Sequence, residues 1–94
     1  MIESVKDKNG KDLYIISTWE SNDSHPWNMI ASLDECQKRY NSLTQEKDDE
    51  SWFVKKVKED ASSYRKMCSL VVNRKGWGFD YMRVVTLEPA HYHC

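Results

Sequence analysis

Residues 67–87 read MCSLVVNRKGWGFDYMRVVTL and predict a β-hairpin. The run that ends at Val72 is rich in β-branched residues, and residues 77–87 alternate aromatic or apolar with polar side chains over much of their length. Between them, Asn73-Arg74-Lys75-Gly76 fits a type I turn closed by a glycine in the left-handed conformation. Pro89 ends the second strand, because proline cannot donate a hydrogen bond to a neighbouring strand.

A second hairpin is predicted at the N-terminal end, with strands near 2–7 and 12–19. Asn9-Gly10 lies between these runs, and both residues tolerate the positive φ of a type I′ turn. Apolar side chains occur on both faces of the later strand, which indicates a central strand that is partly buried on both sides.

The middle of the chain predicts a helix over 33–44, after a polar loop at 20–27 and a short extended segment at 27–31. Ser32 can cap this helix, and Glu35 completes a capping box three residues later. Apolar residues then recur at spacings of three and four, as one face of a helix requires. These residues are Leu33, Cys36, Tyr40 and Leu43.

A second helix is predicted to begin within residues 48–51 and to end near Ser62-Ser63. Acidic residues at its start suit the positive end of the helix dipole, and Asp49 or Ser51 can cap it. The residues that follow at helical spacing are Phe53, Val57, Ala61 and Tyr64.

Together these elements predict the order β-β-α-α-β-β in one domain, residues 1–94, with residues 90–94 as a C-terminal tail. The expected fold is α+β and two-layered: a four-stranded antiparallel sheet with two helices on one face and its other face open to solvent or a partner. The aromatic residues expected in its core are Trp77, Phe79, Tyr81, Phe53, Tyr40 and Tyr64.

Charge and composition exclude several broad classes of protein. The formal net charge is −1, from 14 Lys and Arg against 15 Asp and Glu, so general attraction to nucleic acid or anionic membrane is not supported. No stretch approaches a membrane span, and Met1–Ser4 does not begin a signal peptide. Three widely spaced cysteines do not form a disulfide framework. We therefore expect a cytoplasmic protein with free thiols.

Eleven aromatic residues, four of them tryptophan, exceed what a core of this size readily hides. Tryptophan, tyrosine and arginine dominate binding hot spots, so the surplus indicates a binding surface. The partner contacts that we predict come from the loop bracketed by two tryptophans and from the start of the second helix: Trp19, Asp23, His25, Trp27, Glu50 and Trp52. The alternative is that the loop tryptophans fold back over the edge of a thin core.

These features favour a non-enzymatic protein-binding module that occludes a partner's working surface. In size and lack of catalytic motifs the chain loosely resembles phage-encoded inhibitors of host defence, of the anti-CRISPR type, and bacterial toxin-immunity proteins. That resemblance covers no specific motif. It implies a host or cognate protein as the partner and no cofactor. A homodimer formed through the open sheet face stays an alternative.

A different hypothesis is binding of single-stranded nucleic acid or a nucleotide on residues 77–83. Trp77, Phe79 and Tyr81 alternate on one face of a strand, where aromatic rings can stack on bases, and Arg83 follows them. Burial of these rings under helices is the more common use of such a strand, and the pI near 6.3 also disfavours nucleic acid.

Metal binding and cysteine chemistry receive little support from the sequence. His91, His93 and Cys94 could share a metal, but the further ligands of a four-coordinate site show no paired spacing, so we predict no metal. Cys36 and Cys68 lie on predicted apolar faces and are expected to be buried thiols. The acidic residues show no spacing that singles out a catalytic pair.

Overall fold

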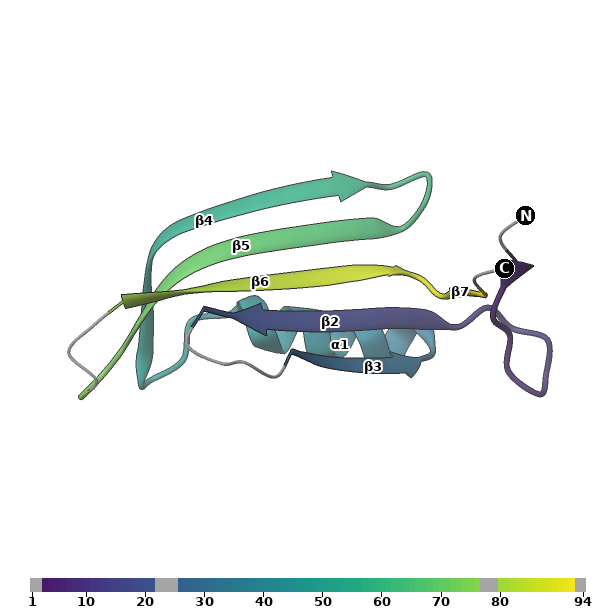
Figure 1. Cartoon of the computed structure of the whole chain (residues 1–94), viewed down its shortest axis with the longest axis horizontal. Coiled ribbons are helices and arrows are strands. Elements are labelled where there is room, and N and C mark those ends of the chain that lie inside the picture. The colour runs from purple at the N-terminus through teal and green to yellow at the C-terminus, as the bar shows by residue number, and fades with distance from the viewer. Residues whose placement is uncertain (1–2, 22–25, 77–79, 93–94) are drawn as a thin grey trace.

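A computed structural model of the chain describes residues 3–21, 26–76 and 80–92 (Figure 1). Within these ranges five strands form an antiparallel sheet in the order β3-β2-β6-β5-β4, and β1 pairs with β7 in a small separate sheet. The elements are β1 Glu3–Ser4, β2 Tyr14–Glu20, β3 Trp27–Ala31, α1 Leu33–Thr44, β4 Glu50–Asp60, β5 Arg65–Arg74, β6 Asp80–Pro89 and β7 His91–Tyr92.

The prediction of a four-stranded sheet under two helices was therefore wrong: the described residues form a five-stranded sheet with one helix. The segment taken for a second helix is strand β4, antiparallel to β5. Its aromatic and β-branched residues favour a strand, and the spacing of Phe53 and Val57 was coincidental. Ser62 and Ser63 form the β4–β5 turn instead of a helix end, and both hydrogen-bond to the Asp60 carboxylate.

The fifth strand is β3, the short extended segment predicted at 27–31. It adds to the sheet by pairing with β2, from Thr18 opposite Trp27 to Tyr14 opposite Ala31. Its place at the edge follows from the short connection to β2, since strands that are consecutive in sequence usually pair.

Helix α1 has the predicted bounds, residues 33–44, and the predicted cap. The Glu35 amide donates to the Ser32 hydroxyl oxygen over 3.3 Å, and Asp34 and Glu35 lie in the first turn, where the helix dipole favours negative charge. Cys36 and Tyr40 face the sheet and are buried. The capping box and the apolar stripe were sufficient to place this element.

The Asn9-Gly10 turn forms, but with a different geometry from the one predicted. Gly10 has φ +80°, while Asn9 is not among the described residues with positive φ, so the turn is not type I′. The Gly10 amide donates to the Asp7 carbonyl, and the Asp7 amide donates to the Lys11 carbonyl. This is a type I turn followed by a left-handed glycine.

The core lies between α1 and one face of the sheet, which we call the helix face. Neighbouring strands bring Ile16 opposite Leu87 and Cys68 opposite Val85 on this face, and all four side chains are fully buried. Tyr40 and Tyr81 are buried as predicted, whereas Phe53 and Tyr64 are exposed, contrary to prediction. Both exceptions belong to the β4–β5 hairpin, which was misread as a helix.

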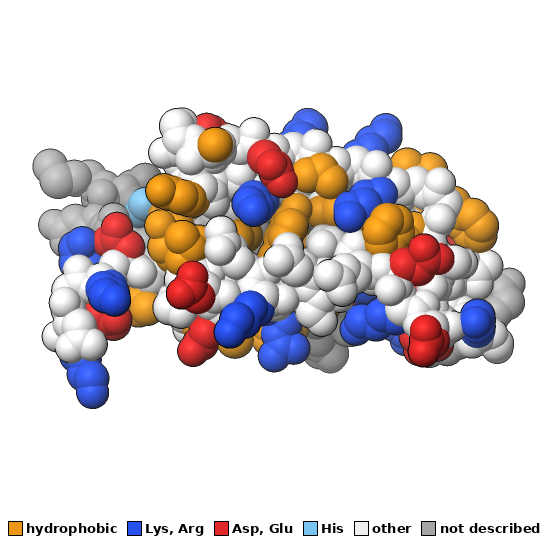
Figure 2. All heavy atoms as spheres, turned by 180° about the vertical axis from the view of Figure 1, so that it is seen from behind, with side chains coloured by type: hydrophobic (Ala, Val, Ile, Leu, Met, Phe, Trp, Pro, Cys, Tyr) orange, Lys and Arg blue, Asp and Glu red, His pale blue; other side chains and the backbone are white. Residues whose placement is uncertain are grey.

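The molecule is elongated, with extents of 46 × 25 × 21 Å and a radius of gyration of 14.8 Å. A compact domain of this length has a radius of about 12 Å. Seen from the side of α1, the upper half over β4 and β5 gathers apolar side chains, whereas charged ones dominate the lower half (Figure 2). In the described part of the chain, α1 falls short of the length and apolar character that a membrane crossing requires.

Candidate functional site

The sheet face opposite α1, which we call the open face, presents rows of side chains fixed by strand register. One row runs across Trp19, Val84, Ser69 and Lys56, on β2, β6, β5 and β4. A neighbouring row runs across Met82, Val71 and Val54. Successive residues of a strand point to opposite faces, so these side chains lie opposite the buried core residues.

Apolar side chains in these two rows form a patch that the described residues leave in solvent. Three of them are large and exposed: Trp19 at 45%, Val54 at 46% and Met82 at 44%. Val71 and Val84 are half-buried between them. We call these residues the open-face patch; they are Trp19, Val54, Val71, Met82 and Val84.

Two hydrogen bonds hold the end of β2 against β6 and fix the position of the patch. The Ser21 amide donates to the Met82 carbonyl over 2.9 Å, and the Met82 amide donates to the Ser21 hydroxyl over 3.0 Å. Trp19, two residues before Ser21, is therefore carried by a well-paired part of the strand. Because the backbone that carries Trp19 is fixed before contact, binding there loses little backbone freedom.

A hollow beside the patch is too small for a typical organic ligand. Its volume is about 140 Å³, and its lining includes Val54, Val71 and Met82 with the polar Ser69 and Lys56. Small-molecule sites usually enclose roughly 300–1,000 Å³. The open face is therefore better suited to a broad contact than to an enclosed ligand.

Trp19 and Trp27, which bracket the predicted binding loop, project to opposite faces of the sheet. Trp27 pairs with Thr18, whose side chain is buried on the helix face, and the Arg39 guanidinium of α1 lies 5.4 Å from the Trp27 ring centre. Trp27 is 43% exposed. The other two predicted loop contacts, Asp23 and His25, lie outside the described residues.

Trp52 is half-buried against the core at the start of β4. The Lys55 ammonium lies 4.5 Å from its ring centre and also donates to the Thr44 carbonyl at the end of α1. Trp52 therefore covers the edge of the thin core. This is the role that the alternative hypothesis gave to the loop tryptophans, Trp19 and Trp27.

Glu50, predicted as a surface contact, is instead buried in an ion-pair cluster on the helix face. Its Oε1 accepts from Arg83 Nη2 over 2.9 Å and from Arg74 Nη2 over 3.1 Å. Arg83 Nε also donates to Glu20 Oε1 over 3.0 Å, and both arginines donate to the Tyr81 hydroxyl. Glu50 and Arg83 are 6% and 4% exposed, so this carboxylate does not face a partner.

Two opposing effects set the pKa values in this cluster: burial disfavours the charged forms, and ion pairing favours them. Burial raises the pKa of the Glu50 carboxyl, but hydrogen bonds and charge from Arg83 and Arg74 outweigh it, so the pKa lies below its usual value. Burial lowers the pKa of Arg83, and contact with Glu50 outweighs that effect and raises it. All three groups stay charged near neutral pH, as a structural cluster requires.

The described residues of the aromatic strand do not form a base-stacking surface. Tyr81 and Arg83 are buried under α1 and its following segment, and the Arg83 guanidinium donates to the Leu43 carbonyl. Trp77 and Phe79 lie outside the described residues. A base could not reach the Tyr81 ring without opening the core, so nucleic-acid binding gains no support here.

The thiols and the C-terminal histidines add no reactive centre within the described ranges. Cys36 and Cys68 are free and buried, and burial raises the pKa of both thiols, which keeps them protonated and unreactive. No group of three or more His, Cys, Asp or Glu side chains that could hold a metal occurs among the described residues. His93 and Cys94 fall outside them.

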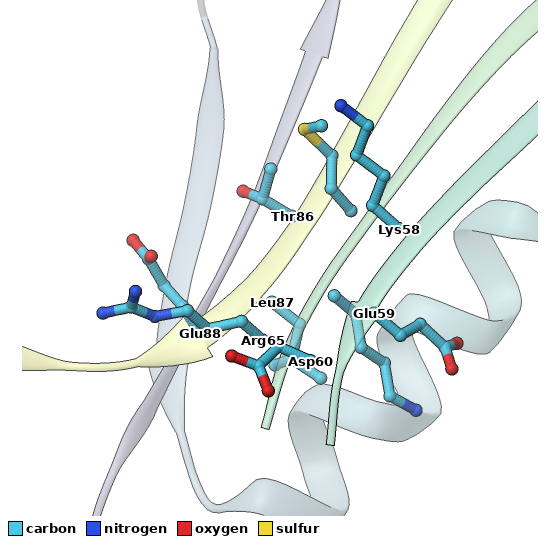
Figure 3. Close-up of a pocket in the computed structure, with 9 residues that line it drawn as sticks. Lys58, Glu59, Asp60, Arg65, Thr86, Leu87 and Glu88 are labelled. Atoms are coloured by element: carbon cyan, nitrogen blue, oxygen red, sulfur yellow. The ribbon is translucent and has the colours of Figure 1, made fainter. Parts of the chain in front are cut away.

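A larger hollow, about 310 Å³, lies where β4, β5 and β6 approach the β4–β5 turn (Figure 3). Its lining residues divide between the two faces of the sheet, with Lys58 and Thr86 on one side and Glu59 on the other. Three cations and three anions surround it: Lys58, Arg65, Lys66, Glu59, Asp60 and Glu88. The balanced charge and the two-sided lining select no class of ligand.

A third hollow, about 360 Å³, lies between α1 and β3, beside Met29. Its other lining residues are four polar side chains of α1: Glu35, Lys38, Arg39 and Ser42. Arg39 is already engaged with Trp27. Small-molecule sites are mostly apolar with a few converging polar groups, and this lining is the reverse.

Comparison with protein-family models, with curated proteins and with solved structures finds no match to the chain. The function of the chain is therefore inferred from the geometry of its described residues. In that geometry Met82, Val54 and Val84 join Trp19, and the sequence prediction did not name them as contacts. Alternation along residues 80–89 is the signal that could have found two of them, because Met82 and Val84 point away from buried Tyr81 and Val85.

Proposed function

We propose that the protein is a small non-catalytic module that binds a partner protein through its open face. The observation that carries this proposal is the exposure of Trp19, Val54 and Met82 together on a sheet face that α1 does not cover. Exposed apolar patches of this kind are typical of interaction sites.

The chemistry of the patch favours a protein partner over a small ligand. Tryptophan supplies a large contact area, and methionine adapts its shape to an apposed surface. The adjoining hollow holds too little volume for a cofactor-sized molecule. Lys56 lines the same hollow and forms no ion pair with the described residues, so we infer a partner surface that is apolar at its centre and carboxylate-bearing at its edge.

The mode of action that we infer is steric occlusion of the partner's working surface by the open face. This is the mode expected of the inhibitors of host defence and toxin-immunity proteins that the sequence loosely resembles. The buried free thiols Cys36 and Cys68 fit a reducing compartment, which supports the cytoplasm as the place of action.

Site-specific photo-crosslinking tests this proposal. A benzophenone amino acid replaces Trp19 in one variant and Trp27 in a matched control, because the two tryptophans have nearly equal exposure on opposite faces. We expect a discrete adduct with another protein from position 19, absent from position 27 and suppressed by Met82→Glu in the same chain.

Three results would contradict the proposal. One is equal adducts from positions 19 and 27, which would indicate indiscriminate contact. Another is no adduct from position 19 in a correctly folded variant. The third is an adduct with a second copy of this chain, which would make the open face a homodimer interface.

A further inference from the structure

Strand β4 is the outermost strand at one edge of the sheet and extends away from α1 (Figure 1). It is 11 residues long and pairs with β5 on its inner side. The strand at the opposite edge, β3, has five residues. Helix α1 packs chiefly against β6, β2 and β3, which leaves the outer side of β4 uncovered by the described elements.

The regular part of β4 runs from Val54 to Asp60, after a bulge between Trp52 and Val54. Alternate residues of an edge strand direct both the amide and the carbonyl outward. About half of this segment therefore offers paired donors and acceptors to an added strand.

The side chains of this edge combine positive charge with exposed apolar groups. Lys56 and Lys58 lie on the open-face side and form no ion pair within the described part of the chain. Phe53 is 61% exposed and Val57 is 47% exposed beside them. Lysine alone would protect an edge from aggregation. The neighbouring apolar groups give the edge a surface that a bound strand would cover.

A second copy of the chain matches this edge less well than an acidic strand does. Antiparallel pairing of two β4 strands about a two-fold axis sets Lys56 against Lys58 when the axis passes through Val57, and an axis through Lys56 or Lys58 sets that lysine against itself. These registers also pair Lys55 with Glu59 or Lys56 with Asp60. However, Lys55 already contacts Trp52 and the Thr44 carbonyl, and the Asp60 carboxylate already accepts from Ser62 and Ser63. An added strand with carboxylates opposite Lys56 and Lys58 gives attraction at both lysines.

We propose that the outer edge of β4 accepts an extended segment of another protein as a sixth strand. The segment carries carboxylates at alternate positions, facing Lys56 and Lys58, and apolar side chains between them, beside Val57 on the other face. This edge adjoins the open-face patch at Val54 and Lys56, but the mode of binding is different, because backbone hydrogen bonds to an added strand supply it.

Binding of a synthetic peptide tests this proposal. The probe is a fluorescein-labelled peptide of about seven residues, matched to Val54–Asp60, with glutamates opposite Lys56 and Lys58 and valines at the other positions. Fluorescence anisotropy at low salt should show saturable binding, and K56E/K58E should weaken it about tenfold, because two attractive cross-strand pairs become repulsive. The matched control K8E/K11E changes two exposed lysines of the N-terminal hairpin and should bind as the unchanged protein does.

Two further arms separate strand addition from simple attraction of charges. A peptide with N-methylated valines cannot donate backbone hydrogen bonds from those residues and should bind at least about tenfold more weakly. Trp19→Ala should leave peptide binding unchanged, so failure of the open-face proposal would not affect this one.

The proposal is overturned if the N-methylated and unmodified peptides bind equally, or if K56E/K58E binds as tightly as K8E/K11E. Absence of any binding by the acidic peptide would also overturn it. So would concentration-dependent self-association that K56E/K58E alters, because the edge would then pair with itself. Circular dichroism of each variant verifies that the sheet is intact.

Discussion

Arg83 is a buried cation that the helix face accommodates because two carboxylates and a phenol hydroxyl surround it. Glu50→Ala removes its closest partner and leaves the charge buried, which should cost about 3–5 kcal/mol in the free energy of unfolding. Urea denaturation followed by circular dichroism measures this loss. Glu46→Ala, on the exposed segment after α1, is the control and should change stability by less than about 0.5 kcal/mol.

Glu50 also makes the stability of the fold depend on pH. The pKa of Glu50 is lower in the folded chain than in the unfolded chain, so its contribution is present above the unfolded pKa and is lost as pH falls through the folded value. Glu50→Gln should therefore give a shallower fall in unfolding free energy between about pH 5 and pH 3 than the unchanged protein shows. Parallel curves for the two proteins would mean that Glu50 is not charged in the fold.

Two predicted contact residues, Glu50 and Trp52, have other roles in the structure. Glu50 and Trp52 were predicted as contacts because they were thought to begin a helix, and the strand places both on the helix face. A buried ion-pair cluster joins residues far apart in sequence, such as Glu20 and Arg83, and no local pattern announces it. Of the contact residues predicted from the sequence, Trp19 is the one that lies in the open-face patch.

At the scale of elements, α1 offers a direct test of its cap. Ser32→Ala removes the acceptor for the Glu35 amide and should lower the unfolding free energy by about 1 kcal/mol. Thermal denaturation measures the change, and Ser42→Ala, on an exposed position of the same helix, should have a smaller effect. An equal effect at the two positions would show that the cap contributes nothing of its own.

The elements that local chemistry defines were predictable from the sequence. The capping box placed α1, and Gly10 and Gly76 have the positive φ expected of turn glycines. The bounds of the hairpins were partly wrong. Asn73 and Arg74, predicted as turn residues, belong to β5, and β1 pairs with β7 instead of β2, while the N-terminal segment meets the residues before β2 at an isolated bridge between Lys6 and Asp12. Strand β4 was mistaken for a helix because an edge strand is exposed on much of its surface, so the period-2 alternation of a half-buried strand is weak there. Lysines between its valines obscured the pattern further.

At the scale of the whole molecule, a thin and elongated sheet leaves much of one face outside the core. An open face was predicted, but its composition depended on the strand order β3-β2-β6-β5-β4, which sequence reasoning did not supply. That order brings Trp19 from β2 into one patch with Val54 from β4, across two intervening strands. The proposed binding surface is thus a property of topology more than of any single segment.

The most direct test of the proposed function compares Trp19→Ala with Trp27→Ala for affinity toward the partner identified by crosslinking. Isothermal titration calorimetry should show that Trp19→Ala weakens binding about thirtyfold, the loss of about 2 kcal/mol expected for a central anchor. Trp27→Ala, equally exposed on the helix face, should change affinity less than about twofold. A greater loss from Trp27→Ala, or equal losses from both, would contradict binding through the open face.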